Sequence, residues 1–327
     1  MINKIDTYQT IGIIGLAKNT GKTTTLNAFI SYYKNERLGL TSIGLDGERI
    51  DQVNFLPKPR IHVYKQMIVA TSKACLETTT ATYRILVETP FLTALGKVII
   101  VVIEEEGDIV LAGPTTNHEL NILLKLMKMY ATRIFVDGAL SRITFSALSE
   151  LDGIVLTTGA AFSVMMDETI QKTAHILNTF SYPITHLELP NNASFYIKTN
   201  TSYFTRTNKS LEAMYSALKL TKDITHVYIK GAITERFIDM MIDLKIKGFT
   251  LIIDDATKLL FHYRMATVFD KLNIKVEVKK QTPIIMITIN PFSPVGAHYD
   301  SNIFLKRISA LTTIPVINVM EEASYGK

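Results

Sequence analysis

Short aliphatic runs alternate with longer segments of helical periodicity along most of this 327-residue chain. The runs at residues 11–15 and 98–103 contain no polar side chain. A strand that is apolar on both of its sides needs cover on both faces, and parallel sheets flanked by connecting helices provide that cover. The alternation therefore predicts the α/β class, with a doubly wound and mostly parallel sheet.

The pattern places individual elements along the first half of the chain. Strands are expected at residues 11–15, 41–45, 97–103, 108–111, 133–136 and 153–157. Helical periodicity predicts helices at residues 22–34, 68–87, 117–129 and 164–177. Three consecutive acidic residues and a glycine at 104–107 separate two of these strands. They predict a hairpin turn.

The segment at residues 190–208 interrupts the alternation, because it is rich in Asn, Thr, Ser and Tyr. It indicates either a domain boundary or an edge hairpin of the same domain. Beyond it, strands are expected at 226–230, 250–254, 275–278, 284–289 and 315–319, and helices at 234–246, 257–272 and 300–311. We therefore predict a nucleotide-binding domain at 1–190, a connecting segment at 191–225 and a second, smaller α/β region at 226–327.

Composition excludes several classes of protein. The 35 basic and 30 acidic residues give a net charge of +5 without a basic arm, which disfavours a nucleic-acid binder. The lone Cys75 excludes an intramolecular disulfide and a cysteine-based zinc cluster. No secretory pattern opens the chain, and no run approaches the roughly 20 apolar residues that span a bilayer. We expect a cytoplasmic protein that binds neither membrane nor nucleic acid.

The most specific motif begins at the end of the first predicted strand. Gly15 closes that strand, a loop follows, and the Gly21-Lys22-Thr23 triplet opens a helix. This strand–loop–helix order is the context that a phosphate-binding loop (Walker A) requires. Backbone N–H groups at the start of the helix would bind phosphate, Lys22 would contact the terminal phosphates, and Thr23 would bind Mg²⁺ through its hydroxyl.

The loop is one residue longer than the common form, because five residues separate Gly15 from Gly21. It does not contain the Gly-x-Gly-x-x-Gly of a dinucleotide site. Lys18 is either a solvated side chain or an auxiliary phosphate contact. The predicted nucleotide-binding residues are Gly15, Lys18, Asn19, Thr20, Gly21, Lys22, Thr23 and Thr24.

A phosphate loop that uses Mg²⁺ needs acidic side chains at neighbouring strand ends. Asp46 follows the second predicted strand, with Glu48 as a further candidate, and either could also form a turn. Asp137 follows four mostly apolar strand residues, as a Walker-B acid does. Glu104 competes for that role, although three consecutive acids more often form a solvated turn. We predict Lys22, Asp46 and Asp137 as catalytic residues, and Thr23, Asp46 and Asp137 as metal ligands.

Three other strand ends carry polar residues. The segment 157–161 (Thr-Thr-Gly-Ala-Ala) either shapes a ligand pocket or packs a strand tightly against a helix. The segments 254–257 and 290–296 could form a second site or a subunit contact. The alternative for these two is helix capping by Asp255 and a loop ordered by proline.

The first ~190 residues resemble the dethiobiotin-synthetase-like class of P-loop proteins, because of the Gly-x5-Gly-Lys-Thr loop and the Val136-Asp137-Gly138-Ala139 segment. Nearly the whole chain resembles the ATPase-like reactivase subunits that accompany bacterial adenosylcobalamin-dependent lysine aminomutases. The segments that carry this resemblance are residues 15–23, 45–48, 111–114, 136–142, 254–257 and 290–296.

The resemblance implies binding of ATP with Mg²⁺, ATP hydrolysis, and a role in exchanging damaged cobalamin from a mutase. The implied partners are the aminomutase or a second reactivase subunit, and a homo-oligomer is compatible with this reading. Two alternatives stay open. One is a dethiobiotin-synthetase-like ligase or kinase that acts on a small molecule. The other is a nucleotide-binding scaffold without meaningful turnover.

Overall fold

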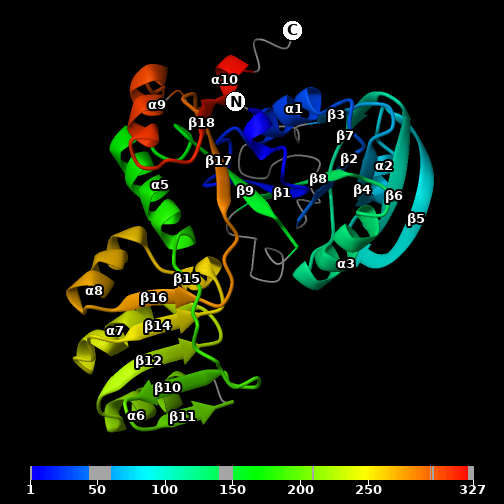
Figure 1. The fold of residues 1–327 in the computed structure, drawn as a ribbon. Helices are drawn as coiled ribbons and strands as arrows, with labels where there is room; N and C mark the ends of the chain where they lie inside the picture. Colours follow the sequence, from blue (N-terminus) through cyan, green and yellow to red (C-terminus); the bar gives the residue numbers. More distant parts are fainter. Residues whose placement is uncertain are drawn as a thin grey trace. The chain divides into compact units, whose positions relative to one another are not determined.

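The computed structural model describes residues 2–43, 60–139, 150–207, 210–294, 296 and 298–322. The chain forms two compact units (Figure 1). The first consists of residues 1–173 and 282–327, and the second of residues 174–281. In the described part of the chain, no helix combines the length and the apolarity required to cross a membrane.

A nine-stranded sheet organises the first unit, in the order β18-β17-β9-β1-β8-β2-β4-β6-β5. From β18 to β4 every neighbouring pair is parallel, whereas β6 is antiparallel to both β4 and β5. The strands are β1 (Thr10–Gly15), β2 (Leu38–Ser42), β4 (Ile68–Ser72), β5 (Thr82–Thr93), β6 (Gly96–Glu105), β8 (Arg133–Ala139), β9 (Gly153–Gly159), β17 (Ile284–Asn290) and β18 (Val316–Asn318). The protein is therefore α/β, with a large, mixed and mostly parallel sheet.

Helices cover both faces of this sheet. The first unit contains η1 (Ile2–Ile5), α1 (Lys22–Tyr32), α2 (Lys73–Leu76), α3 (Asn117–Met127), α9 (Ser301–Ser309) and α10 (Val319–Glu322), and α5 (Met166–Phe180) begins in it. Phe29 of α1 packs in the core cluster with Leu40 of β2. The adjacent Gly39 faces the other side, where a Cβ atom would lie 3.3 Å from Met127 of α3. A small antiparallel pair, β3 (Ile61–Val63) with β7 (Gly107–Ile109), completes the described part of the unit.

The second unit is a smaller α/β structure. Its five-stranded sheet has the order β11-β10-β12-β14-β16, in which β12, β14 and β16 are parallel and β10 is antiparallel to both of its neighbours. The strands are β10 (Phe195–Thr199), β11 (Tyr203–Arg206), β12 (Ile224–Ile229), β14 (Thr250–Ile253) and β16 (Lys275–Val278). The remaining elements are α6 (Leu211–Leu220), β13 (Ile233–Thr234), α7 (Glu235–Asp243), η3 (Ala256–Lys258), β15 (Leu259–Leu260), η4 (Tyr263–Met265) and α8 (Ala266–Lys271).

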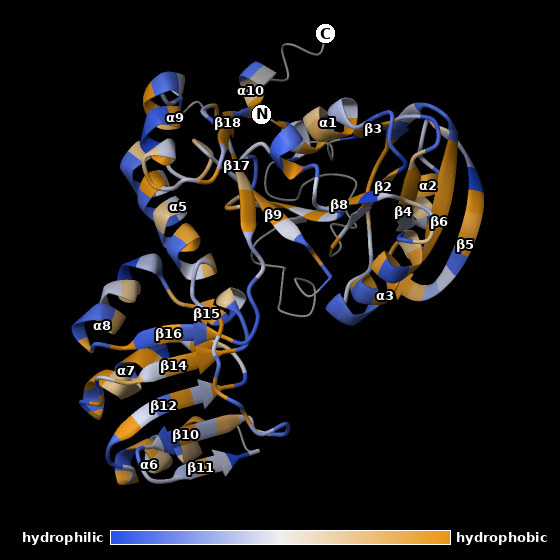
Figure 2. Ribbon diagram, viewed as in Figure 1, coloured by the Kyte–Doolittle hydropathy of each residue, from blue (hydrophilic) through white to orange (hydrophobic). Residues whose placement is uncertain are grey.

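Each unit has its own hydrophobic core. Figure 2 shows β17 of the first unit and β14 of the second largely in the hydrophobic colour. In the second unit, Val227 and Leu251 from neighbouring strands are fully buried in one cluster with Phe237 and Met241 of α7. Burial of aliphatic side chains on this scale stabilises each unit mainly through the hydrophobic effect.

The helix predicted at residues 68–87 is wrong. The segment forms β4, the one-turn helix α2 and the first half of β5. Ile68 and Val69 pair with Val102 and Val101 of β6, so cross-strand partners that are distant in the sequence override the helical spacing. The helix predicted at 257–272 is also wrong in its first half, where η3, β15 and η4 lie.

The hairpin predicted around residues 104–107 is wrong as well. The strand before it, β6, pairs with β4 and β5, whereas the strand after it, β7, pairs with β3. A Cβ atom at Gly107 would lie 2.4 Å from the backbone nitrogen of Ala81, so glycine is needed there for a close passage past another segment.

The two compact units do not follow the predicted boundaries at 190 and 225. The segment predicted as a connection, residues 191–225, contributes β10, β11 and α6 to the second unit. β10 and β11 form an antiparallel hairpin at the edge of its sheet, so the segment is an edge hairpin, but of the second unit and not of the first. Residues 282–327 belong to the first unit, because β17 pairs with β9 and β18 pairs with β17.

Candidate functional site

The loop between β1 and α1 folds back over the end of β1. Asn19 has a φ of 61° and Gly21 a φ of 93°, in the left-handed region that favours glycine. A Cβ atom at Gly15 would lie 2.8 Å from Oγ1 of Thr20 and 2.9 Å from Cδ of Lys22. The aliphatic stem of Lys22 therefore crosses directly over Gly15, and any larger residue at position 15 would displace it.

Hydroxyl groups fix this loop to the next strands of the sheet. Thr20 is fully buried, and its Oγ1 lies 3.0 Å from both the carbonyl oxygen of Ala17 and Oγ1 of Thr157 on β9. Oγ1 of Thr25 in α1 lies 2.8 Å from Oγ1 of Thr288 on β17. Both pairs are buried, so they hold the loop and the start of α1 in a defined position.

The start of α1 leaves backbone donors open. Gly21 occupies the N-cap position, and no described side chain caps the helix. The first N–H groups of a helix have no acceptor within it, and the helix dipole favours an anion at this end. Thr23 and Thr24 lie half-buried in the first turn, while Lys18 and Asn19 are exposed on the loop. The predicted phosphate-binding residues thus form one continuous turn of chain.

Asp137 lies beside this turn, because β8 is the neighbour of β1 in the sheet. The pairing sets Asp137 opposite Ile13 of β1 and Ser42 of β2. Its Oδ1 lies 3.6 Å from Nζ of Lys22, and about three quarters of each side chain is buried. Oδ1 is itself buried and has no hydrogen-bond donor among the described residues. The structure therefore brings together Lys22 and Asp137, which are 115 positions apart in the sequence.

Asp46 and Glu48 lie outside the described residues, so their predicted places at the loop stay predictions. Glu104 lies elsewhere: it forms an ion pair with Arg84 at 3.4 Å, and both side chains are more than half exposed. Three strands, β8, β2 and β4, separate its strand β6 from β1 in the sheet. The acidic side chain that the described structure places beside Lys22 is Asp137, and not its competitor Glu104.

Asn290 lies beside this loop, although its segment was predicted to form a second site, a subunit contact or a loop ordered by proline. It ends β17, and its Nδ2 donates to the carbonyl oxygen of Asn19 at 3.4 Å. A Cβ atom at Gly21 would lie 3.0 Å from Cβ of Asn290. A polar residue at the end of an apolar strand was the available signal. No sequence signal indicates the strand order, in which β17 lies next to β9 and β9 next to β1.

In the second unit, polar groups meet where β12, β14 and β16 end. The hydroxyl of Tyr228 donates to Oδ1 of Asp254 at 2.9 Å, and Nζ of Lys279 lies 3.5 Å from the same oxygen. Asp255 accepts hydrogen bonds from the N–H (2.8 Å) and the hydroxyl of Thr257, so its predicted capping role is confirmed. Burial raises the pKa of the Asp255 carboxyl, although these bonds act to lower it.

The candidate site thus consists of an open helix start, a lysine folded across a glycine, and one carboxylate on the adjacent strand. Within the described residues, no group of three or more His, Cys, Asp and Glu side chains could hold a metal ion by itself. A divalent ion here would therefore depend on ligand oxygens and water as well as on protein. Comparison of the chain with protein-family models, with curated proteins and with solved structures finds no match.

Proposed function

We propose that this chain binds ATP through a phosphate loop at residues 15–24 and hydrolyses it with Mg²⁺. The observation that carries the proposal is the Lys22–Asp137 pair at 3.6 Å, set at the start of α1, which no side chain of the described residues caps. A lysine and a strand-borne acid on either side of a phosphate are what phosphoryl transfer requires. The α/β sheet supports it further, because ligands of such sheets bind beyond the carboxyl ends of the strands.

The residues present fit a magnesium ion. Mg²⁺ prefers oxygen ligands, and the Thr23 hydroxyl and the Asp137 carboxylate supply them. Oδ1 of Asp137 is a buried acceptor without a donor among the described residues, and a cation or its water shell would satisfy it. When bound, the ion would neutralise charge on the phosphates and stabilise the charge that develops during transfer.

Backbone and side-chain groups of the protein would position the phosphates. Backbone N–H groups of residues 21–24 would orient the phosphates, and Lys22 would exchange its contact with Asp137 for one with the terminal phosphate. The buried Thr20–Thr157 bond would hold the loop in place during that exchange. Such pre-organisation lowers the barrier because the donors need no rearrangement when charge develops.

We further propose that ATP turnover serves a protein partner, as in the reactivase subunits of lysine aminomutases. Two features support this. The motifs at residues 254–257 and 290–296 belong to the resemblance and lie outside the segment that a dethiobiotin-type ligase resembles. In addition, residues 174–281 form a compact unit that the phosphate loop does not require. Its size and separate core suit a docking element better than part of a small-molecule pocket.

The Lys22→Ala variant tests the nucleotide site. We expect its affinity for ATP to fall at least about tenfold, because charge-assisted hydrogen bonds to phosphate contribute about 1.5–3 kcal/mol. Isothermal titration calorimetry with a non-hydrolysable ATP analogue gives the affinity. The matched control is Lys34→Ala, since Lys34 is an exposed lysine just beyond the end of α1. Equal affinity in wild type and Lys22→Ala would refute the site.

A further inference from the structure

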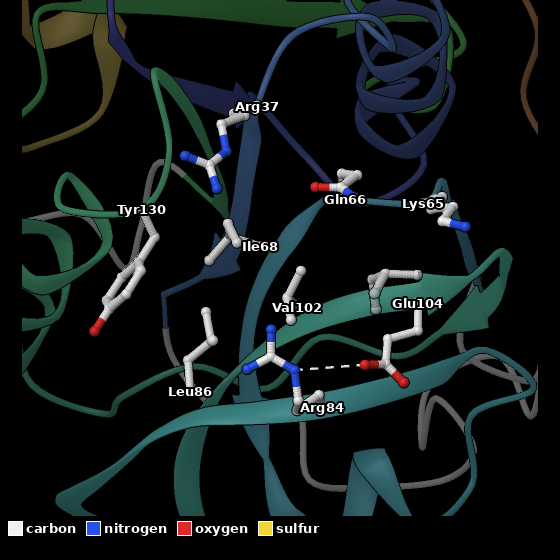
Figure 3. A pocket seen from close by; sticks show the side chains of 10 residues that line it. Arg37, Lys65, Gln66, Ile68, Arg84, Leu86, Val102, Glu104 and Tyr130 are labelled. Carbon is white, nitrogen blue, oxygen red and sulfur yellow. Dashed lines mark ion pairs between the residues drawn. The ribbon is translucent and has the colours of Figure 1, made fainter.

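A pocket lies on the first unit, where the parallel strands β2 and β4 begin (Figure 3). It has a volume of about 350 Å³. The loop at residues 15–21 follows the carboxyl end of β1, whereas this pocket includes Arg37, which precedes the amino end of the parallel strand β2. The two places are therefore at opposite ends of the parallel strands, and a ligand in one would not touch the other.

Strand register defines the floor of the pocket. Ile68 of β4 pairs with Val102 of β6, which in turn pairs with Arg84 of β5. Their sequence neighbours Val69 and Val101 face the opposite side, in the core cluster with α1. Ile68, Val102 and Arg84 therefore project from the face that α3 covers, with Leu86 beside them in the pocket.

The charge of the pocket is positive. Arg37, Lys65 and Arg84 line it together with a single acid, Glu104. Within the described part of the chain, the side chains of Arg37 and Lys65 form no hydrogen bond or ion pair. Arg84 and Glu104 form one at 3.4 Å, with 64% and 54% of these side chains exposed. An exposed pair of this kind contributes about 0–1 kcal/mol, so a competing anion can take over Arg84 at little cost.

We propose that this pocket binds a small organic anion that carries an apolar body. Its carboxylate or phosphate would lie against the guanidinium group of Arg37, which is suited to planar, bidentate contact with such groups. Its hydrocarbon part would lie on Ile68, Leu86 and Val102. The volume falls within the range of small-molecule sites, and an apolar floor with a few polar groups is their usual composition.

Figure 3 supports this division of roles. Arg37 and Arg84 appear on opposite sides of the apolar side chains of Ile68 and Val102, and Tyr130 borders the same space. The ion pair turns Arg84 toward Glu104. A cation in place of an anion would be repelled by the positive charge of Arg37 and Lys65.

Methyl NMR of the full-length protein, labelled at Ile, Leu and Val, tests the proposal. The anionic probes are hexanoate and hexyl phosphate, and the matched probes are 1-hexanol and hexylammonium at equal ionic strength. We expect the methyl signals of Ile68, Leu86 and Val102 to shift saturably with at least one anion. The better anion of the two identifies whether carboxylate or phosphate is preferred.

Charge-matched variants test whether the guanidinium group of Arg37 is responsible for anion binding. Arg37→Gln is expected to weaken anion binding about tenfold, as loss of a hydrogen bond to a charged group does. Lys97→Gln removes an exposed charge near the start of β6 and is expected to leave binding unchanged. Three results would overturn the proposal: no saturable shift with either anion, equal shifts with 1-hexanol, or unchanged anion affinity in Arg37→Gln. None of them depends on ATP binding at the phosphate loop.

Discussion

At the scale of single residues, Asp137 has the sharpest electrostatic requirement in the candidate site. One of its carboxylate oxygens is buried without a hydrogen-bond donor among the described residues, and the nearest cation, Lys22, lies 3.6 Å away. A carboxylate in such a place is stabilised only in part by a single lysine, because unsatisfied buried acceptors cost free energy. A divalent cation near Thr23 would complete its environment.

We therefore expect Asp137→Asn to change the magnesium dependence of nucleotide binding. Loss of the charge should weaken Mg²⁺ affinity of the nucleotide complex about tenfold or more, because a carboxylate that would hold the ion or its water shell is removed. Binding of ATP without Mg²⁺ should persist, because Lys22 and the backbone donors are retained. Titration of Mg²⁺ at fixed ATP measures this. The control is Glu104→Gln, and superimposable Mg²⁺ titrations for wild type and Asp137→Asn would remove Asp137 from the metal role.

The sequence motif alone identifies part of the candidate site. Gly15, Gly21, Lys22 and Thr23 could be identified from the sequence because a strand, a loop and a helix follow one another without interruption. Asn290 could not, because its place beside Gly21 depends on β17 entering the sheet next to β9. Local spacing predicts a contiguous motif, but contacts across neighbouring strands require the strand order.

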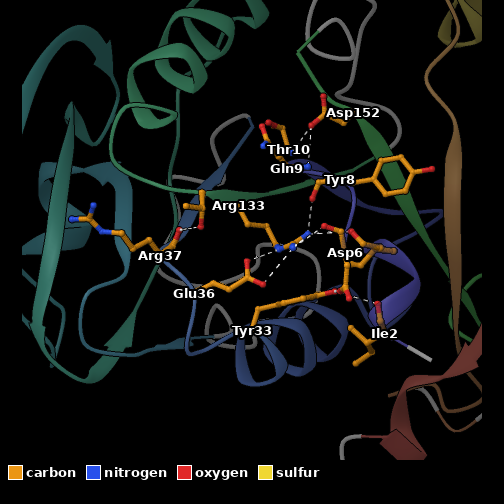
Figure 4. A network of polar contacts seen from close by, with 12 residues as sticks. Ile2, Asp6, Tyr8, Gln9, Thr10, Tyr33, Glu36, Arg37, Arg133 and Asp152 are labelled. Atoms are coloured by element: carbon orange, nitrogen blue, oxygen red, sulfur yellow. Dashed lines mark hydrogen bonds and ion pairs between the residues drawn. The ribbon is translucent and has the colours of Figure 1, made fainter.

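At the scale of secondary-structure elements, Arg133 ties the start of β8 to the N-terminal segment (Figure 4). It is buried, and its Nη1 donates to the carbonyl oxygens of Ile5 (3.1 Å) and Tyr8 (2.5 Å). Its Nε donates to the carboxylate of Glu36 at 2.9 Å, and its guanidinium carbon lies 4.2 Å from the ring centre of Tyr33. One side chain thus connects η1, α1 and the turn before β2.

Tyr33, at the end of α1, closes the same network. Its hydroxyl donates to Oδ1 of Asp6 at 2.6 Å and to the carbonyl oxygen of Ile2 at 3.2 Å. Burial, reinforced by the bond to Asp6, raises the pKa of the Tyr33 hydroxyl. The hydroxyl therefore remains a donor throughout the physiological pH range, and the N-terminal segment keeps this attachment.

Arg133→Met tests how much these elements depend on that connection. We expect the free energy of unfolding of the first unit to fall by about 2–3 kcal/mol, because several carbonyl groups and Glu36 lose a charged donor. Urea unfolding followed by circular dichroism measures the loss. The control is Arg307→Met, which breaks a largely exposed pair with Asp167 and should cost less than about 1 kcal/mol. Equal stability of the two variants would contradict a structural role for Arg133.

Among the secondary-structure elements, the helix predicted at residues 68–87 shows that hydrophobic periodicity alone does not determine the structure of a segment. The apolar residues of segment 68–87 fit a helix, yet Ile68 and Val69 lie in a strand that pairs with β6 on one side and β2 on the other. The segment is rich in β-branched residues, and these pack well on a pleated surface. The parallel strands β1, β8 and β9 were predicted because each contains a short continuous run of apolar residues, a pattern that a short amphipathic helix does not produce.

At the scale of the whole molecule, the second unit is an insertion. The chain leaves the first unit within α5 and returns before β17, so two adjacent strands of one sheet, β9 and β17, are separated by 174–281. Sequence patterns detected both α/β regions but not this connectivity, because strand pairing between residues 154–159 and 284–290 leaves no local signal. The insertion gives the first unit an attached element with a hydrophobic core of its own.

A partner role makes a thermodynamic prediction for the whole protein. If a cobalamin-inactivated lysine aminomutase binds the ATP-bound form more tightly, then linkage requires it to strengthen ATP binding by the same factor. We expect low ATP turnover by the protein alone and stimulation by the inactivated mutase. The stimulation should be absent in Lys22→Ala and retained in Lys34→Ala.

Two titrations measure the linkage: mutase binding with and without a non-hydrolysable ATP analogue, and analogue binding with and without mutase. Equal factors above one, together with stimulated turnover, would support a reactivating accessory role, in which nucleotide-dependent ordering of loops changes how the partner is held. A factor of one in both titrations would refute that role while leaving the nucleotide site intact. ATP consumption that responds to a small carboxylic acid and not to the mutase would instead indicate a ligase, because such an enzyme transfers the phosphoryl group to its own substrate without a protein partner.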